Sequence, residues 1–151
     1  MMGLVVVHVL TAILGLGPAY AFPFLLRKAL TVEEMKRNLM QVAYLEIFPK
    51  IFGTLAVLSG LLLFFLGSYG PFAQVWIIGS LAVYVGIEIL VIGFLNPSAA
   101  KLLKFIDETG EKTREEPGVH LNGLYSRVRS LHLWAGILGL LLFVFMIAKP
   151  D

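Results

Sequence analysis

The chain has 151 residues, of which 58% are hydrophobic and only 15% are charged, with a formal net charge of +2. A soluble domain carries about a quarter charged residues, so this chain has too few to cover a globular surface, and lipid must be the solvent for much of it. It has no basic stripe interleaved with aromatic residues, which argues against a nucleic-acid partner. It also has no cysteine, which excludes disulfides, thiolate metal sites and iron–sulfur clusters.

Four segments are long and apolar enough to cross a bilayer, which takes about 20 residues of helix. They run over residues 3–26, 44–66, 74–95 and 131–148. The first is interpreted as a retained span and not as a signal peptide, because no Lys or Arg precedes it. The sequence therefore predicts one all-α domain over residues 1–151, an integral membrane four-helix bundle in contact with the lipid bilayer.

Positive charges predict the orientation of this bundle. They are concentrated in the first connection, residues 27–43, and in the third, residues 96–130, whereas residues 67–72 carry none. Because positive connections stay in the cytoplasm, both termini are predicted outside, in a multi-pass protein of the bacterial cytoplasmic membrane.

The third connection, residues 96–130, is the main cytoplasmic loop of this prediction. Asn96-Pro97 is expected to end the third span, because proline disfavours helix in the residue before it. Residues 98–108 are expected to form a short amphipathic helix, and residues 121–130 to extend the fourth span.

Glycines recur every seven residues in the two middle spans. They lie at positions 53, 60 and 67 of the second span and at 79, 86 and 93 of the third. This spacing keeps small residues on one helix face, where they let membrane helices approach closely. We interpret it as packing between the second and third spans.

His8 is the strongest candidate ligand, because ionisable residues inside a membrane are costly and mark functional sites. It lies roughly 8 Å below the outer surface at about 1.5 Å per residue. His8, Thr11 and Gly15 fall on one stripe of the first span. Gly15 leaves room for a flat ring, which favours a cofactor bound by His8. The alternative is a hydrogen bond from His8 to a neighbouring helix.

His132 opens a similar stripe in the fourth span, which continues through Gly136, Gly139 and Phe143. It is the second candidate ligand. Because it lies near the inner boundary, where placing a histidine costs little free energy, a structural role is the stronger alternative.

Glu88 is the deepest carboxylate, roughly 9–10 Å above the inner surface. An isolated charge there would take up a proton or find a partner, and Lys50 lies at a matching depth. We predict an intramembrane charge pair between Glu88 and Lys50, with His132 and Arg129 as other possible partners and a proton relay as the functional alternative. Pro49 is expected to kink the second span beside it.

A family resemblance is carried by His8, Gly15, Gly17, Pro23 and Arg27. This pattern of an early histidine, a glycine-rich middle and a basic end resembles the first helix of HemJ-type protoporphyrinogen oxidases. It is also similar to CopD-like copper-resistance membrane proteins. HemJ-type proteins bind haem b, so the resemblance implies a haem site at His8. The aromatic residues that follow this histidine in HemJ-type helices are missing here, which weakens the implied oxidase activity more than the implied haem.

Over nearly its whole length the chain resembles a bacterial family of predicted integral membrane proteins. The fourth span, which opens with Arg129-Ser130-Leu131-His132, is part of this wider resemblance. It implies a four-span fold and no particular activity.

The leading hypothesis is a haem-b-binding membrane protein acting in electron transfer, haem handling or gas sensing. As an enzyme it would be a haem-dependent membrane oxidoreductase, with a quinone or a redox protein as partner. The alternative is a cofactor-free small transporter or an accessory subunit of a membrane complex. The oligomeric state is open, a homo-oligomer included.

The two candidate iron ligands are expected at different depths. The first span enters from outside and the fourth from inside, so His8 and His132 should lie on the order of 20 Å apart along the membrane normal. We therefore expect His8 to hold an outer haem, five-coordinate or with a weak ligand such as Met146. His132 would serve a separate inner site or a structural bond.

The topology predicts that Tyr69 and Glu111 lie on opposite sides of the membrane. Because the chain has no cysteine of its own, single cysteines at these positions can be labelled without background. An impermeant thiol reagent should reach them from opposite faces of sealed vesicles. Labelling of both from one face would contradict the four-span model.

Overall fold

The computed structural model describes residues 2–67, 75–109 and 117–148, so Tyr69 and Glu111 lie outside the described residues. Within the described part the regular secondary structure is entirely helical. The elements are α1 (Met2–Leu16), the 3₁₀ turn η1 (Pro18–Ala21), α2 (Phe22–Leu25), α3 (Val32–Leu45), α4 (Ile47–Leu66), α5 (Val75–Glu88), the π-helical η2 (Ile89–Leu95), α6 (Asn96–Thr109) and α7 (Val119–Ala148).

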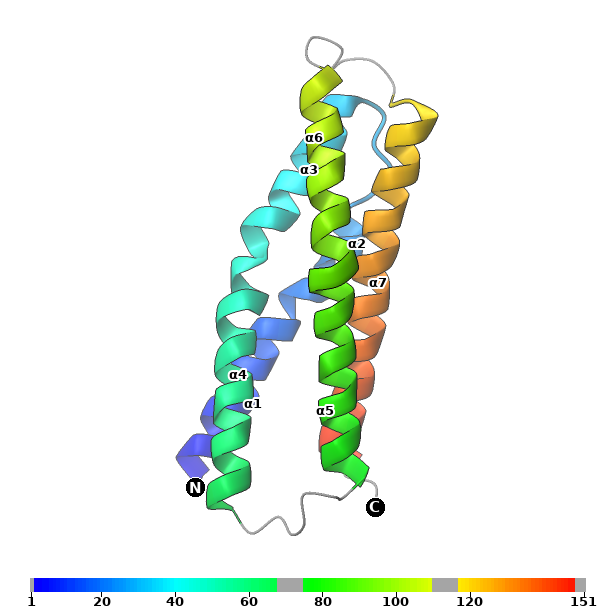
Figure 1. Cartoon of the computed structure of the whole chain (residues 1–151). Helices are drawn as coiled ribbons and strands as arrows, with labels where there is room; N and C mark the ends of the chain where they lie inside the picture. The colour runs from blue at the N-terminus through cyan, green and yellow to red at the C-terminus, as the bar shows by residue number, and fades with distance from the viewer. Residues whose placement is uncertain (1, 68–74, 110–116, 149–151) are drawn as a thin grey trace.

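These elements join into four long apolar units, which confirms the predicted all-α four-helix membrane fold. The units are Met2–Leu25, Val32–Leu66, Trp76–Glu108 and Val119–Ala148, with lengths of 24, 35, 33 and 30 residues. At 1.5 Å per residue, the last three measure about 45–52 Å, well beyond the roughly 30 Å hydrocarbon core of a bilayer. Their excess length lies at one end, opposite the start of α1 and the end of α7 (Figure 1). We call this end the head: α3, α6 and residues 119–130 of α7.

The first connection is mostly helix, which the sequence analysis missed. Only Leu26–Thr31 is non-helical before α3 begins. The Thr31 hydroxyl caps α3 by accepting from the Glu34 N–H at 3.1 Å, and the Glu34 carboxylate accepts from the Leu30 N–H at 2.8 Å. This reciprocal bonding is close to a capping box, and its Thr-x-x-Glu signature was available in the sequence.

The expected end of the third span at Asn96-Pro97 is wrong. The helix continues from α5 through η2 into α6, and the Asn96 N–H bonds to the carbonyl of Val91, five residues back. Proline has no N–H and its ring clashes with the carbonyl four residues earlier, here Gly93. The wider π turn accommodates Pro97 without ending the helix. The expected helices over residues 98–108 and 121–130 are confirmed, as parts of α6 and α7.

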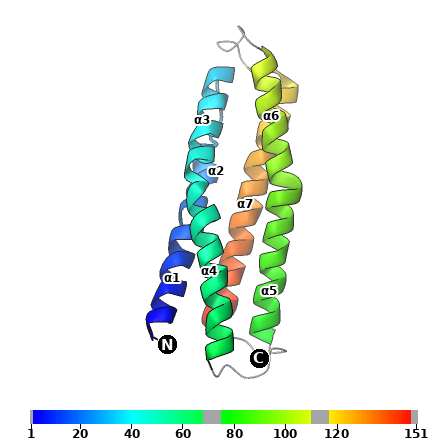
Figure 2. The same cartoon turned by 60° about the vertical axis from the view of Figure 1, so that its left-hand side comes forward.

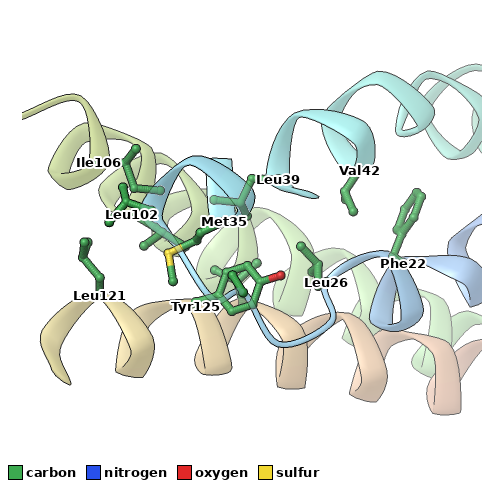
Figure 3. Packing of buried hydrophobic residues seen from close by; sticks show 12 residues of the cluster. Phe22, Leu26, Met35, Leu39, Val42, Leu102, Ile106, Leu121 and Tyr125 are labelled. Atoms are coloured by element: carbon green, nitrogen blue, oxygen red, sulfur yellow. The ribbon is translucent and has the colours of Figure 1, made fainter. Parts of the chain in front are cut away.

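The head has a core of the water-soluble type. Met35 of α3 and Leu102 of α6 are fully buried, and Leu26 from the segment before α3 is buried between them and α7. Figure 3 shows these side chains in one cluster, two of them from helices and Leu26 from the non-helical segment. The helices below the head instead expose many Leu, Ile and Val side chains, as lipid contact requires.

A polar network joins α7 to the segment between α2 and α3. The Tyr125 hydroxyl of α7 donates to the Arg27 carbonyl at 2.6 Å, and the Asn38 amide donates to the Tyr125 oxygen at 3.0 Å. Arg129 donates to the Pro23 carbonyl at 3.1 Å. These bonds fasten α2 and the non-helical segment after it to α7.

The membrane half consists of two helix pairs, α1 with α4 and α5 with α7 (Figures 1 and 2). Gly60 faces His8 of α1, and Gly79 faces Phe145 of α7. The prediction that the glycines pack the second span against the third is therefore wrong. The second span packs against the first, and the third packs against the fourth. A seven-residue repeat identifies a close-packing face and leaves open which helix lies against it.

Truncation of Met35 should destabilise the head. Met35→Ala removes a fully buried side chain, and such changes cost about 2–5 kcal/mol of unfolding free energy. Met40→Ala is the matched control, because Met40 lies on the same helix and is 54% exposed. Denaturant unfolding in detergent micelles measures both variants. Equal losses would contradict a packed head.

Candidate functional sites at His8 and His132

His8 is held by α4 through one ring nitrogen. Its Nδ1 lies 2.8 Å from the Ala56 carbonyl oxygen and 3.2 Å from the Ser59 hydroxyl. A carbonyl only accepts, so the Nδ1 of this bond carries the hydrogen and Nε2 keeps its lone pair. Metal-ligating histidines are commonly oriented by such a bond from the second ring nitrogen. The sequence alternative of a hydrogen bond to a neighbouring helix is thus present, and it leaves Nε2 chemically available.

The rest of the His8 stripe is covered by α4. Thr11 is buried, and its hydroxyl donates to the Val7 carbonyl at 2.7 Å. A methyl group at Gly15 would lie 2.8 Å from the backbone N of Gly53. The space that the sequence analysis assigned to a flat ring over Gly15 is therefore filled by the α4 backbone. A cofactor at His8 must approach from the Nε2 side.

The second predicted stripe is occupied by Tyr20. Its ring lies over Gly136, and a methyl group at Gly139 would lie 3.0 Å from its hydroxyl oxygen. This hydroxyl is buried and has no hydrogen-bond partner within the described residues. The room left by the two glycines thus takes an aromatic side chain of the protein itself.

His132 is 8% exposed and lies between Phe22 and Glu46. Phe22 packs against its ring at 5.2 Å between centroids, with the planes at 79°. The His132 Nε2 is 4.0 Å from Glu46 Oε1, which is too long for a hydrogen bond. The Glu46 carboxylate therefore faces this imidazole without bonding to it.

A cavity of about 210 Å³ adjoins His132. It lies between α3, α6 and α7, and Glu46 is its one charged lining residue. Its lining comprises Leu39, Val42, Ala43, Glu46, Asn96, Ala99, Ala100, Leu103, Val128 and His132. Drug-sized ligands occupy roughly 300–1,000 Å³, so this cavity has room only for a smaller group.

Two helix irregularities meet at this cavity. Glu46 separates α3 from α4, three residues before Pro49, and Asn96 follows the π turn just before Pro97. The predicted kink near Pro49 therefore appears as a break at Glu46, because proline disrupts the turn that precedes it. The irregularities next to the two prolines thus bring the Glu46 carboxylate and the Asn96 amide to the wall of this cavity.

The predicted charge pair has different partners. Lys50 Nζ lies 3.8 Å from Glu46 Oε2, and the Lys50 side chain is 71% exposed. Glu88 ends α5 and interacts with the Tyr84 hydroxyl one turn earlier. Within the described residues no ion pair joins Glu88 to Lys50. Equal depth in the membrane, which the sequence predicts for Glu88 and Lys50, does not specify which helix faces which.

The two histidines lie far apart along α4. His132 approaches Glu46, whereas His8 contacts Ala56 and Gly60. Ten to fourteen residues of helix correspond to about 15–21 Å, in line with the separation expected from the sequence. Within the described residues no group of three His, Asp or Glu side chains gathers to hold a metal ion.

Gly15 should resist enlargement where Gly86 does not. Gly15→Ala pushes a methyl group against the Gly53 backbone, and such overpacking costs about 1–3 kcal/mol. Gly86→Ala meets open space and gains helix propensity, so it should be neutral or stabilising. Thermal unfolding of the two variants in one detergent compares them. A destabilised Gly86→Ala with an unaffected Gly15→Ala would contradict the α1–α4 contact.

A protein-family model described as "Predicted integral membrane protein (DUF2269)" matches residues 2–150. No curated protein and no solved structure matches the chain. The likeness of the first span to HemJ-type and CopD-like proteins therefore stays a prediction. Because the match covers nearly the whole chain, the protein belongs to this DUF2269 family of predicted integral membrane proteins.

Proposed function

We propose that the protein binds haem b in the outer half of the membrane, with His8 as the axial ligand, and acts in electron transfer, haem handling or gas sensing. The observation that carries this proposal is the bond from His8 Nδ1 to the Ala56 carbonyl. It fixes the tautomer in which Nε2 is free to bind iron, and it orients the ring. Haem b needs an axial ligand from the protein, and histidine is its usual source.

The two histidines differ in how well they suit this role. His8 is half-buried, with Nδ1 bonded and no hydrogen bond at Nε2 within the described residues. His132 is almost fully buried, with Phe22 against its ring and a cavity of only about 210 Å³ beside it. A porphyrin does not fit that space, so the proposal assigns the iron to His8 and not to His132.

The chain's own residues would tune the bound group. Haem supplies one-electron chemistry or gas binding when bound. The Ala56 carbonyl and the Ser59 hydroxyl hold the imidazole in place and raise its basicity. Gly60 lets the ring lie close to α4, since a methyl group there would lie 2.8 Å from the His8 ring. A quinone or a redox protein would be the electron partner.

The second candidate is a cofactor-free membrane component, such as a small transporter or an accessory subunit. The coverage of Gly15 by the α4 backbone favours it, because His8 then serves as a polar tie between two helices. Interhelical hydrogen bonds of this kind stabilise membrane bundles by about 0.6–2 kcal/mol.

The haem proposal predicts a coloured protein whose colour depends on His8. Protein purified from cells supplied with a haem precursor should show a Soret band at near one haem per chain. His8→Ala should abolish the band, and added imidazole should partly restore it. His132→Ala should keep most of it, and His120→Ala is the exposed control.

Each other outcome has a definite meaning. Colourless wild-type protein would favour the cofactor-free component. Complete loss in His132→Ala as well would mean that the two histidines share one iron, against their separation along α4. Retention in both variants would show that His8 is not the ligand.

A further inference from the structure

We propose that the cavity between α3, α6 and α7 binds a primary ammonium group, held by the Glu46 carboxylate and the His132 imidazole. The cavity lies ten or more residues along α4 from the His8 contacts, so this inference does not rest on the haem proposal.

The first argument is the gap between the two polar groups. His132 Nε2 and Glu46 Oε1 are 4.0 Å apart, beyond hydrogen-bond range, and the described residues give the imidazole no hydrogen bond. His132 is 8% exposed, so most of its ring lies away from bulk water. Buried polar groups are almost always hydrogen-bonded, which calls for an occupant that reaches both groups from the cavity.

The second argument is the chemistry of the lining. Glu46 brings a negative charge and two acceptor oxygens, and a neutral His132 brings one acceptor nitrogen. Asn96 adds an amide oxygen, and the other walls are apolar. An ammonium group has three donors and no acceptor, which matches this set. An anion would be repelled by Glu46, and a neutral group would bring no charge to complement the carboxylate from the cavity side.

Lys50 does not fill this role. It lies 3.8 Å from the other carboxylate oxygen of Glu46, and its side chain is 71% exposed, so it approaches from outside. It is also absent from the cavity lining, where Glu46 is the one charged residue. The Oε1 side of the carboxylate is therefore the one that faces His132.

The position of the cavity limits the source of the ammonium group. It lies where α3 meets α4 and where η2 passes into α6, at the boundary between the lipid-exposed half and the head. Ethanolamine is a group of suitable size, and it exists both as a soluble amine and as the headgroup of phosphatidylethanolamine. Choline carries the same charge, but its methyl groups replace every N–H donor.

The test uses the full chain in nanodiscs of phosphatidylcholine. Ethanolamine or choline is added to one set, and a second set contains phosphatidylethanolamine. A ligand that binds only the folded state raises the unfolding temperature, so ethanolamine chemistry should raise it and choline should not. A rise with free ethanolamine identifies a soluble amine, and a rise only with the lipid identifies a headgroup.

Two variants separate the cavity from a general bilayer effect. Glu46→Gln removes the charge and should weaken ethanolamine binding about 10- to 100-fold. Ala99→Leu fills the cavity and keeps both polar groups, and it should abolish the response. Glu33→Gln on α3 is the exposed control and should respond like the wild type. Equal behaviour of wild type in ethanolamine and choline, and in the two lipids, would overturn the proposal. So would a response that survives in both Glu46→Gln and Ala99→Leu.

Discussion

The excess of helix length over bilayer thickness is the constraint on which this architecture depends. Three of the four units have 30 to 35 residues, although about 20 are enough to cross the hydrocarbon core. The excess cannot remain as bare apolar helix in water, so it must bury its apolar side. Val32, Met35 and Leu39 do this against α6 and α7. One chain therefore builds two kinds of packing, driven by the hydrophobic effect in the head and by close contact of small residues in the membrane half.

The transition between the two kinds of packing coincides with the helix irregularities. The break at Glu46 precedes Pro49, and the π turn precedes Pro97. The first unit does not continue into the head as a helix. Its helix ends at Leu25, and a non-helical segment leads from there to α3. At this level His132 is buried and Glu46 is partly buried, and both side chains line the same cavity.

Composition and charge predict the coarse fold well, because the apolar segments must be buried in lipid whatever their neighbours are. The α3 helix was missed although Thr31 and Glu34 carry its capping signature, since a run of basic residues was interpreted only as a loop. The pairing of helices could not be predicted. The glycine repeat identifies a packing face, but whether Gly60 lies against α1 or α5 depends on the whole bundle.

The candidate sites were predictable to a similar degree. His8 and His132 stand out because ionisable side chains are rare in membrane spans, and their separation follows from counting residues. The sequence does not reveal what covers each stripe. Only the packed bundle shows the α4 backbone over Gly15 and Tyr20 over Gly139. It also brings Glu46 to His132, a contact between positions 86 residues apart that no local pattern contains.

The hydrogen bond from Tyr125 to the Arg27 carbonyl constrains when the head can form during synthesis of the chain. It joins positions 98 residues apart, so the segment that leaves the first span is fastened by α7, which is synthesised much later. Until α7 is made, α3 and α6 lack the helix that covers their apolar sides, and the non-helical segment after α2 lacks its bonds to α7. The head therefore closes only after translation has reached α7.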